Sequence, residues 1–183
     1  MSSESYYKVG AVAEPGKWGT ADVPELNFAD LRPLRQKDRT GGKVESWEEW
    51  EYRLKDGGFA DYQNDTGGFR LCSERLRAVL DALASPKDVL QWLPVWVTAE
   101  SGERRRYWIL HFPEQPDLLD WSQTEMLGPV IGRAALDSRK TEGHKIMPSP
   151  DGRRRLFVVL ESVRAVLQEQ GLTGMEFRRF PST

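Results

Sequence analysis

The sequence predicts an α+β fold: a mostly antiparallel sheet packed against two similar amphipathic helices, with an irregular segment at the N-terminus. Three observations predict it. Two stretches, after Ser73 and after Leu160, carry apolar residues at helical spacing. A strand-like apolar run follows each of them. Hydrophobic residues make up 39% of the 183 positions and charged residues 30%, which suits one well-cored globular domain.

The stretch from Arg154 to Phe180 reads as strand, helix, tight turn and strand. Phe157–Val159 is a β-branched apolar run that suits a buried strand. Apolar residues then recur at helical spacing as far as Gly171. Glycine in the left-handed backbone conformation commonly ends a helix at such a position. Met175–Phe177 then alternates apolar and polar residues, as in a strand with one wet face.

A second helix and a hairpin are predicted upstream. Ser73 is a candidate N-cap, and the helix is expected to end near Ser85. Val89–Thr98 and Arg105–Phe112 are expected to pair as a β-hairpin. Pro94 cannot donate to a ladder, so its strand is expected at a sheet edge or with a bulge. The apolar stripe of the helix comprises Leu76, Val79, Leu80 and Leu83.

Residues 1–68 are predicted to be an irregular elaboration packed on a core formed by residues 69–183, within one domain. Tyr6–Val12 reads as a strand, and a short turn is expected around Leu31. Ser46 and Glu49 have the spacing of an N-cap and its capping-box partner, which predicts a helix that continues to about Lys55.

Charge and cysteine content narrow the function classes. The net charge of −2 gives no global field for nucleic acid or membrane, although residues 1–68 hold 9 basic and 13 acidic residues. The single cysteine, Cys72, excludes an internal disulfide and fits a reducing compartment. We see no secretory signal and no apolar run of about 20 residues, so a cytoplasmic protein without a membrane partner is predicted.

The sequence offers little for catalysis, a cofactor or a metal. His111 and His144 are the two histidines, and Cys72 is near neither of them in sequence. No phosphate-binding loop, dinucleotide fingerprint, nucleophile elbow or zinc-binding helix motif is present. We therefore expect no catalytic residue, no cofactor and no metal. An enzyme that depends on Cys72 is one hypothesis for the function, although a cysteine in such a position is more commonly a buried, unreactive thiol.

Two basic triplets, Arg104–Arg106 and Arg153–Arg155, suggest an alternative function in nucleic-acid binding or regulation. Such clusters bind nucleic acid when they share a face with stacking aromatics, here Trp96, Tyr107 or Trp108. Arginines at strand starts also serve as solvated residues that prevent edge pairing. Because the overall charge is nearly neutral, the second explanation is favoured, and we do not expect nucleic acid as a partner.

The candidate partner-binding residues combine large aromatic rings with interleaved carboxylates. Such a combination suits capture of a basic protein, because aromatic residues anchor interfaces and acidic residues steer association. The ordinary explanation is a helix stripe of Trp47, Trp50 and Leu54 packed on the core, with the glutamates in water; the two explanations overlap. The candidate residues are Glu45, Trp47, Glu48, Glu49, Trp50, Glu51, Asp61 and Tyr62.

Several fragments between Phe69 and Phe180 occur in the order of one family. The most specific are Ser73–Leu76, Leu119–Ser122, Gly143-His144 and Gly171–Gly174. In these fragments and their spacing the chain resembles the immunity proteins of bacterial polymorphic toxin systems, of the myxobacterial type labelled immunity protein eleven. Two departures stand out: the last helix has Leu160-Glu161 where the family has Ser-Glu, and residues 1–68 match only loosely.

The resemblance implies a small cytoplasmic protein that binds and neutralises a cognate toxin, often a nuclease. Inhibition would then require either covering the substrate cleft of the toxin or locking its catalytic element. A stable complex of this kind buries about 800 Å² on each partner. The resemblance implies no particular oligomeric state.

Overall fold

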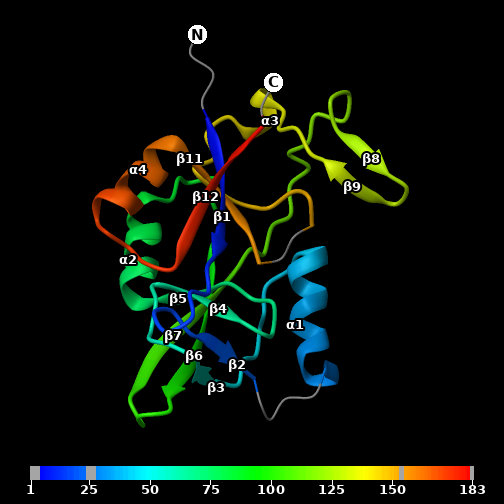
Figure 1. The fold of residues 1–183 in the computed structure, drawn as a ribbon. Coiled ribbons are helices and arrows are strands. Elements are labelled where there is room, and N and C mark those ends of the chain that lie inside the picture. The colour runs from blue at the N-terminus through cyan, green and yellow to red at the C-terminus, as the bar shows by residue number, and fades with distance from the viewer. Residues whose placement is uncertain (1–4, 24–27, 153–154, 182–183) are drawn as a thin grey trace.

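The computed structural model describes residues 5–23, 28–152 and 155–181, and strands dominate it: 38% of residues lie in strands and 20% in helices. Within these ranges the strands form a closed six-stranded barrel, a four-stranded sheet and a two-stranded hairpin (Figure 1). Four helices accompany them in the same ranges. The predicted α+β class, a mostly antiparallel sheet with two similar amphipathic helices and an irregular N-terminal segment, was therefore wrong.

Six strands close the barrel. In order around it they are β2 (Thr20–Asp22), β3 (Trp50–Lys55), β6 (Gln91–Ala99), β7 (Arg104–His111), β5 (Leu71–Ser73) and β4 (Tyr62–Asp65). Two of the pairings, β2 with β4 and β3 with β6, are parallel and join strands far apart in the sequence. Closure removes the unpaired strand edges that an open sheet exposes. Apolar side chains such as Tyr52, Leu71 and Val95 form a buried cluster with other barrel residues.

The four-stranded sheet has the order β10 (Ile146–Pro148), β11 (Phe157–Leu160), β1 (Tyr6–Ala11) and β12 (Met175–Phe180). Two helices, α2 (Glu74–Leu83) and α4 (Glu161–Glu169), pack into one core cluster with residues of this sheet. The N-terminal strand β1 lies between β11 and β12. The expected irregular N-terminal segment is thus incorrect, because it supplies a central strand of the sheet and three strands of the barrel.

The ends of α2 and α4 follow the predicted chemistry. Ser73 caps α2, where its Oγ accepts a hydrogen bond from the Leu76 N–H at 3.1 Å. Gly171 follows α4 with φ +61°, the left-handed conformation that glycine adopts without a Cβ clash. The N–H of Leu172 donates to the Leu167 carbonyl at 3.3 Å, which completes a Schellman motif.

The helix predicted from Ser46 to Lys55 is absent, and this part of the chain enters β3. The residues of β3 alternate, with Tyr52 and Leu54 buried and the residues beside them exposed or half-buried. That alternation is the period of a strand, and here it outweighs the capping-box spacing of Ser46 and Glu49. Consequently Trp47, Trp50 and Leu54 do not form one helical stripe.

The strand that contains Pro94 is not at an edge, because β6 lies between β3 and β7. The predicted edge or bulge is therefore wrong. Pairing with β3 begins at Val95, opposite Trp50, so Pro94 falls just outside that ladder. The carbonyl of Pro94 instead accepts a hydrogen bond from the indole N–H of Trp47 at 2.7 Å. A proline without an N–H is tolerated at such a position.

A helix, α1 (Phe28–Thr40), occupies the region where only a short turn was predicted around Leu31. Its buried residues Leu31, Leu34 and Asp38 recur at i, i+3 and i+7, which places them on one face. Pro33 lies inside the helix, and a proline there removes one backbone donor. In Figure 1, α1 stands beside the barrel on its outer flank.

A hairpin of β8 (Glu125–Leu127) and β9 (Val130–Arg133) projects from the body of the molecule, and α3 (Ser138–Thr141) follows it (Figure 1). Leu127 and Val130 of this hairpin are largely exposed. Among the residues described, no helix has the length and apolar character needed to cross a bilayer.

Candidate protein-interaction site

A groove separates α1 from the segment that leads into β3. Its volume is about 360 Å³. Helix α1 forms one wall, and residues 44–50 form the other. We call this feature the Trp47 groove. The residues that line it are Pro33, Leu34, Lys37, Val44, Glu45, Ser46, Trp47, Glu48 and Trp50.

The wall formed by residues 44–50 is held by hydrogen bonds to β6, although residues 44–49 have no regular structure of their own. The Gln91 side chain accepts from the Val44 N–H at 3.0 Å and donates to the Val44 carbonyl at 2.9 Å. The Trp47 indole donates to the Pro94 carbonyl. From the opposite wall, the Lys37 ammonium donates to the Lys43 carbonyl at 2.6 Å. Val44 and Trp47 are therefore anchored to β6 before any ligand arrives.

Aromatic rings connect the groove to the barrel core. The ring centroids of Trp47 and Trp50 lie 4.4 Å apart, and those of Trp50 and Phe69 lie 5.7 Å apart, both tilted. Phe69 is buried, whereas both tryptophans are only half-buried. Each tryptophan thus presents part of its ring to the groove while the remainder packs against the protein.

The four predicted glutamates divide into two pairs with different environments. Glu45 and Glu48 line the groove, are exposed, and make no ion pair with any residue in the described ranges. Glu49 instead accepts from Arg106 at 2.6 Å and from the Trp96 indole at 2.9 Å. Glu45 and Glu48 therefore have no ion-pair partner among the residues that the structure describes.

Glu51, which lies on β3, is also paired. It accepts from Thr98 Oγ1 at 2.7 Å and lies 3.4 Å from Arg104. The guanidiniums of Arg104 and Arg106 stack on the Trp96 ring, at 4.0 and 5.0 Å from its centroid. Glu49 and Glu51 therefore belong to a paired surface on the outer wall of the barrel.

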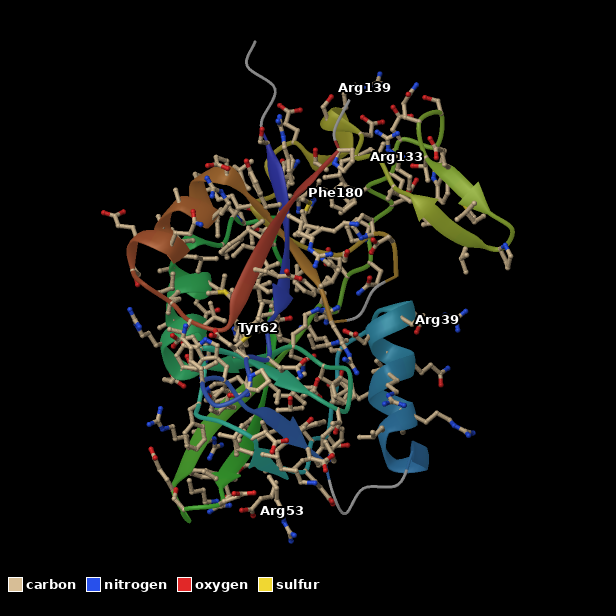
Figure 2. The ribbon with its side chains drawn as sticks, viewed as in Figure 1. Arg39, Arg53, Tyr62, Arg133, Arg139 and Phe180 are labelled. Carbon is tan, nitrogen blue, oxygen red and sulfur yellow. The ribbon has the colours of Figure 1, made fainter. Side chains whose placement is uncertain are left out.

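Asp61 and Tyr62 lie away from the groove. Tyr62 is fully buried, and its hydroxyl donates to the Arg155 carbonyl at 2.6 Å. Figure 2 places it in the interior where the barrel meets the four-stranded sheet. Asp61 accepts from the Thr173 N–H at 2.9 Å and from Ser73 Oγ at 2.7 Å. Both residues join the two sheets, so the structure separates them from the other six candidates.

The arginine triplet of β7 is compensated by carboxylates. In addition to the two pairs above, Arg105 lies 2.7 Å from Glu103. Tyr107 is buried and cannot stack on a nucleobase. Arg153 and Arg154 of the second triplet lie outside the described residues, and Arg155 is exposed. Phosphates would have to displace the carboxylates from the first triplet before they could bind it.

Cys72 and the two histidines do not meet. Cys72 is completely buried, and burial raises the pKa of its thiol well above the ordinary value. The Nε2 of His111 lies 2.9 Å from the Gly42 carbonyl, and the Nδ1 of His144 lies 3.1 Å from Asp88. In the described part of the chain, no three metal-ligating side chains cluster.

Sequence reasoning missed the wall that α1 contributes and the polar cluster that holds it. Asp38 of α1 is buried 2.7 Å from Arg70 and 3.5 Å from His111. Burial acts to raise the pKa of Asp38, but Arg70 and His111 outweigh it and lower the pKa below the usual value. The helical spacing of Leu31, Leu34 and Asp38 was the signal for this helix in the sequence. Pro33 lies among them and argued against a helix there.

Comparison with known protein families found no family that matches this chain. Comparison with curated proteins likewise found no match.

Proposed function

We propose that this protein is a cytoplasmic immunity protein that neutralises a cognate bacterial toxin by stoichiometric binding, without making or breaking a bond itself. Support comes from the fragments between Phe69 and Phe180, which resemble the immunity proteins of polymorphic toxin systems in their sequence and in their order along the chain. The observation that carries the proposal is the Trp47 groove. It combines half-buried tryptophans with two exposed carboxylates that form no ion pair within the described ranges.

The composition of the groove suits a protein partner. Tryptophan is enriched among the residues that dominate binding energy at protein interfaces. Because Trp47 and Val44 are already tied to β6, binding costs little additional ordering of this wall. The unpaired carboxylates of Glu45 and Glu48 would accelerate encounter with a basic surface.

The groove is an anchor within a larger interface. A stable complex buries about 800 Å² on each partner, with about 20 to 30 residues on each side. Nine residues line the groove. The partner must therefore extend over neighbouring surfaces, which include the exposed side of α1. An interface of that size can cover the substrate cleft of a toxin.

Co-expression tests this proposal. The toxin domain encoded by the neighbouring reading frame is expressed from an inducible promoter in a bacterial host, with and without this chain. We expect this chain to restore growth and to co-purify with the toxin domain in a one-to-one complex. Continued killing without any complex would overturn the proposal.

A further inference from the structure

We propose that the Trp47 groove receives a short segment of the partner that carries one large apolar side chain flanked by basic residues. This inference rests on the proposed function in one respect only, namely that the partner is a protein. It specifies which side chains that protein presents to the groove, and it places the contact on the side of α1 that faces residues 44–50.

The apolar part of the inference follows from the lining of the groove. Leu34 approaches from α1, while Val44, Trp47 and Trp50 approach from the opposite wall. The volume of about 360 Å³ lies near the lower end of the range for ligand pockets, about 300–1,000 Å³. The groove therefore accommodates a large side chain with adjoining backbone better than an entire secondary-structure element.

The basic part follows from the distribution of charge around the groove. Glu45 and Glu48 lie on the same wall, both exposed and neither in an ion pair within the described ranges. Their neighbours along the chain, Glu49 and Glu51, are by contrast paired with Arg106 and Arg104. The facing wall contributes one cation, Lys37, whose ammonium is held by the Lys43 carbonyl. Two carboxylates therefore face one ammonium among the lining residues, and their net charge is negative.

The order of the residues along this wall indicates where the basic residues lie in the partner. Glu45 and Glu48 flank Trp47 in the sequence, and all three line the same wall. A side chain seated against Trp47 therefore brings its sequence neighbours close to one carboxylate or the other. Salt weakens such exposed ion pairs, because the Debye screening length is about 10 Å at 0.1 M ionic strength. Apolar contact provides the anchor and the charges provide selectivity.

Three synthetic peptides test the inference directly on the full chain. The first is acetyl-Gly-Lys-Gly-Lys-Phe-Lys-Gly-Lys-Gly-amide. The second has glutamate in place of every lysine, and the third has glycine in place of the phenylalanine. Binding is followed by the ¹⁵N–¹H resonances of the tryptophan indoles and of the 44–50 backbone. We expect the first peptide to shift Trp47 and Trp50 and to bind about tenfold more tightly than either other peptide.

Two protein variants identify the site. The groove variant is Glu45→Lys/Glu48→Lys, and the control variant is Glu142→Lys/Glu169→Lys, which changes the net charge equally. Glu142 and Glu169 are exposed and in no ion pair with a described residue. We expect about tenfold weaker binding of the first peptide by the groove variant and unchanged binding by the control variant. Equal loss in both variants, or shifts confined to residues elsewhere, would overturn the inference.

The outcome is separable from that of the co-expression experiment. Rescue from the toxin, together with no preference for the lysine–phenylalanine peptide, leaves the proposed function standing and overturns this inference. Selective peptide binding without rescue does the reverse: it supports a groove for basic segments and rejects the toxin as its partner.

Discussion

Arg70 donates a hydrogen bond from Nη1 to Asp38 Oδ1 at 2.7 Å, and both side chains are 3% exposed. This buried contact joins the Trp47-groove wall contributed by α1 to the chain just before β5. Arg70 also donates from Nε to the Leu156 carbonyl at 3.0 Å, beside the start of β11. One guanidinium thus connects α1, the barrel and the four-stranded sheet.

Replacing Arg70 by leucine should destabilise the fold by about 3–5 kcal/mol, because Asp38 then remains buried without its main countercharge. Urea unfolding followed by tryptophan fluorescence measures the change. The double variant Asp38→Leu/Arg70→Leu should recover much of the loss, since no buried charge is left unpaired. A cost below about 1 kcal/mol for the single variant would show that the pair does not hold α1.

Asp65 should make the free energy of unfolding fall as pH rises from about 4 to about 7. Burial raises the pKa of Asp65 from 3.8 to about 7, although the N–H groups of Phe69 and Gly68 donate to it. Between these two pKa values the folded chain keeps a proton that the unfolded chain releases. The stabilisation is therefore complete below the pKa of the unfolded chain, and it is lost as pH rises to the pKa of the folded chain. Between about pH 4 and 7 the loss is about 1.4 kcal/mol per pH unit.

Asp65→Asn tests this dependence, because the amide keeps an acceptor oxygen without a charge. We expect the stability of the variant relative to the native chain to increase steadily from pH 4 to pH 7 in urea titrations. A difference that stays constant over this range would contradict the raised pKa of Asp65.

Trp47→Phe should loosen the groove wall without removing its apolar character. The phenyl ring can still contact Trp50, but the indole hydrogen bond to the Pro94 carbonyl is lost. One lost hydrogen bond costs about 1 kcal/mol. Faster amide exchange of the 44–50 backbone and a matching fall in unfolding free energy are the expected readouts. Trp121→Phe serves as control, since Trp121 is 55% exposed and outside the groove.

The arginine triplet of β7 should not bind nucleic acid. Arg104, Arg105 and Arg106 each lie within 4 Å of a carboxylate, at 3.4, 2.7 and 2.6 Å. A fluorescent oligothymidylate titrated at several salt concentrations measures this directly. We expect no saturable binding at physiological salt. A steep decrease of log K with log salt, abolished by Arg104→Glu/Arg106→Glu, would revive the nucleic-acid alternative.

Local chemistry made the N-terminal end of α2 and the C-terminal end of α4 predictable. Ser73 can satisfy a backbone donor, and Gly171 can adopt a positive φ, so both positions carry their own physical reason. The hairpin of β6 and β7 was likewise predictable, because its strands are long and adjacent in sequence. These elements depend on residues that lie close together along the chain.

Barrel closure could not be predicted in the same way. It depends on pairings such as Thr20 with Asn64 and Trp50 with Val95, which join distant residues. Strands β2 and β5 have three residues each, too few for a period to be recognised. The short Ser46–Glu49 capping pattern then suggested a helix where tertiary pairing imposes a strand.

The candidate site was predictable in composition but not in arrangement. Trp47, Trp50, Glu45 and Glu48 do line one groove. The pairing of Glu49 and Glu51 with arginines depends on β3 lying beside β6 and β7, which no local pattern reveals. Tyr62 is buried between the two sheets for the same reason.

The most direct test of the central claim is the affinity of the toxin domain from the neighbouring reading frame for the native chain and for the groove variant, Glu45→Lys/Glu48→Lys, by isothermal titration calorimetry. We predict one-to-one binding that is weakened about tenfold or more in the groove variant and is unchanged in Glu142→Lys/Glu169→Lys. Equal affinity of the native chain and the groove variant would contradict the assignment of the Trp47 groove as the protein-binding site.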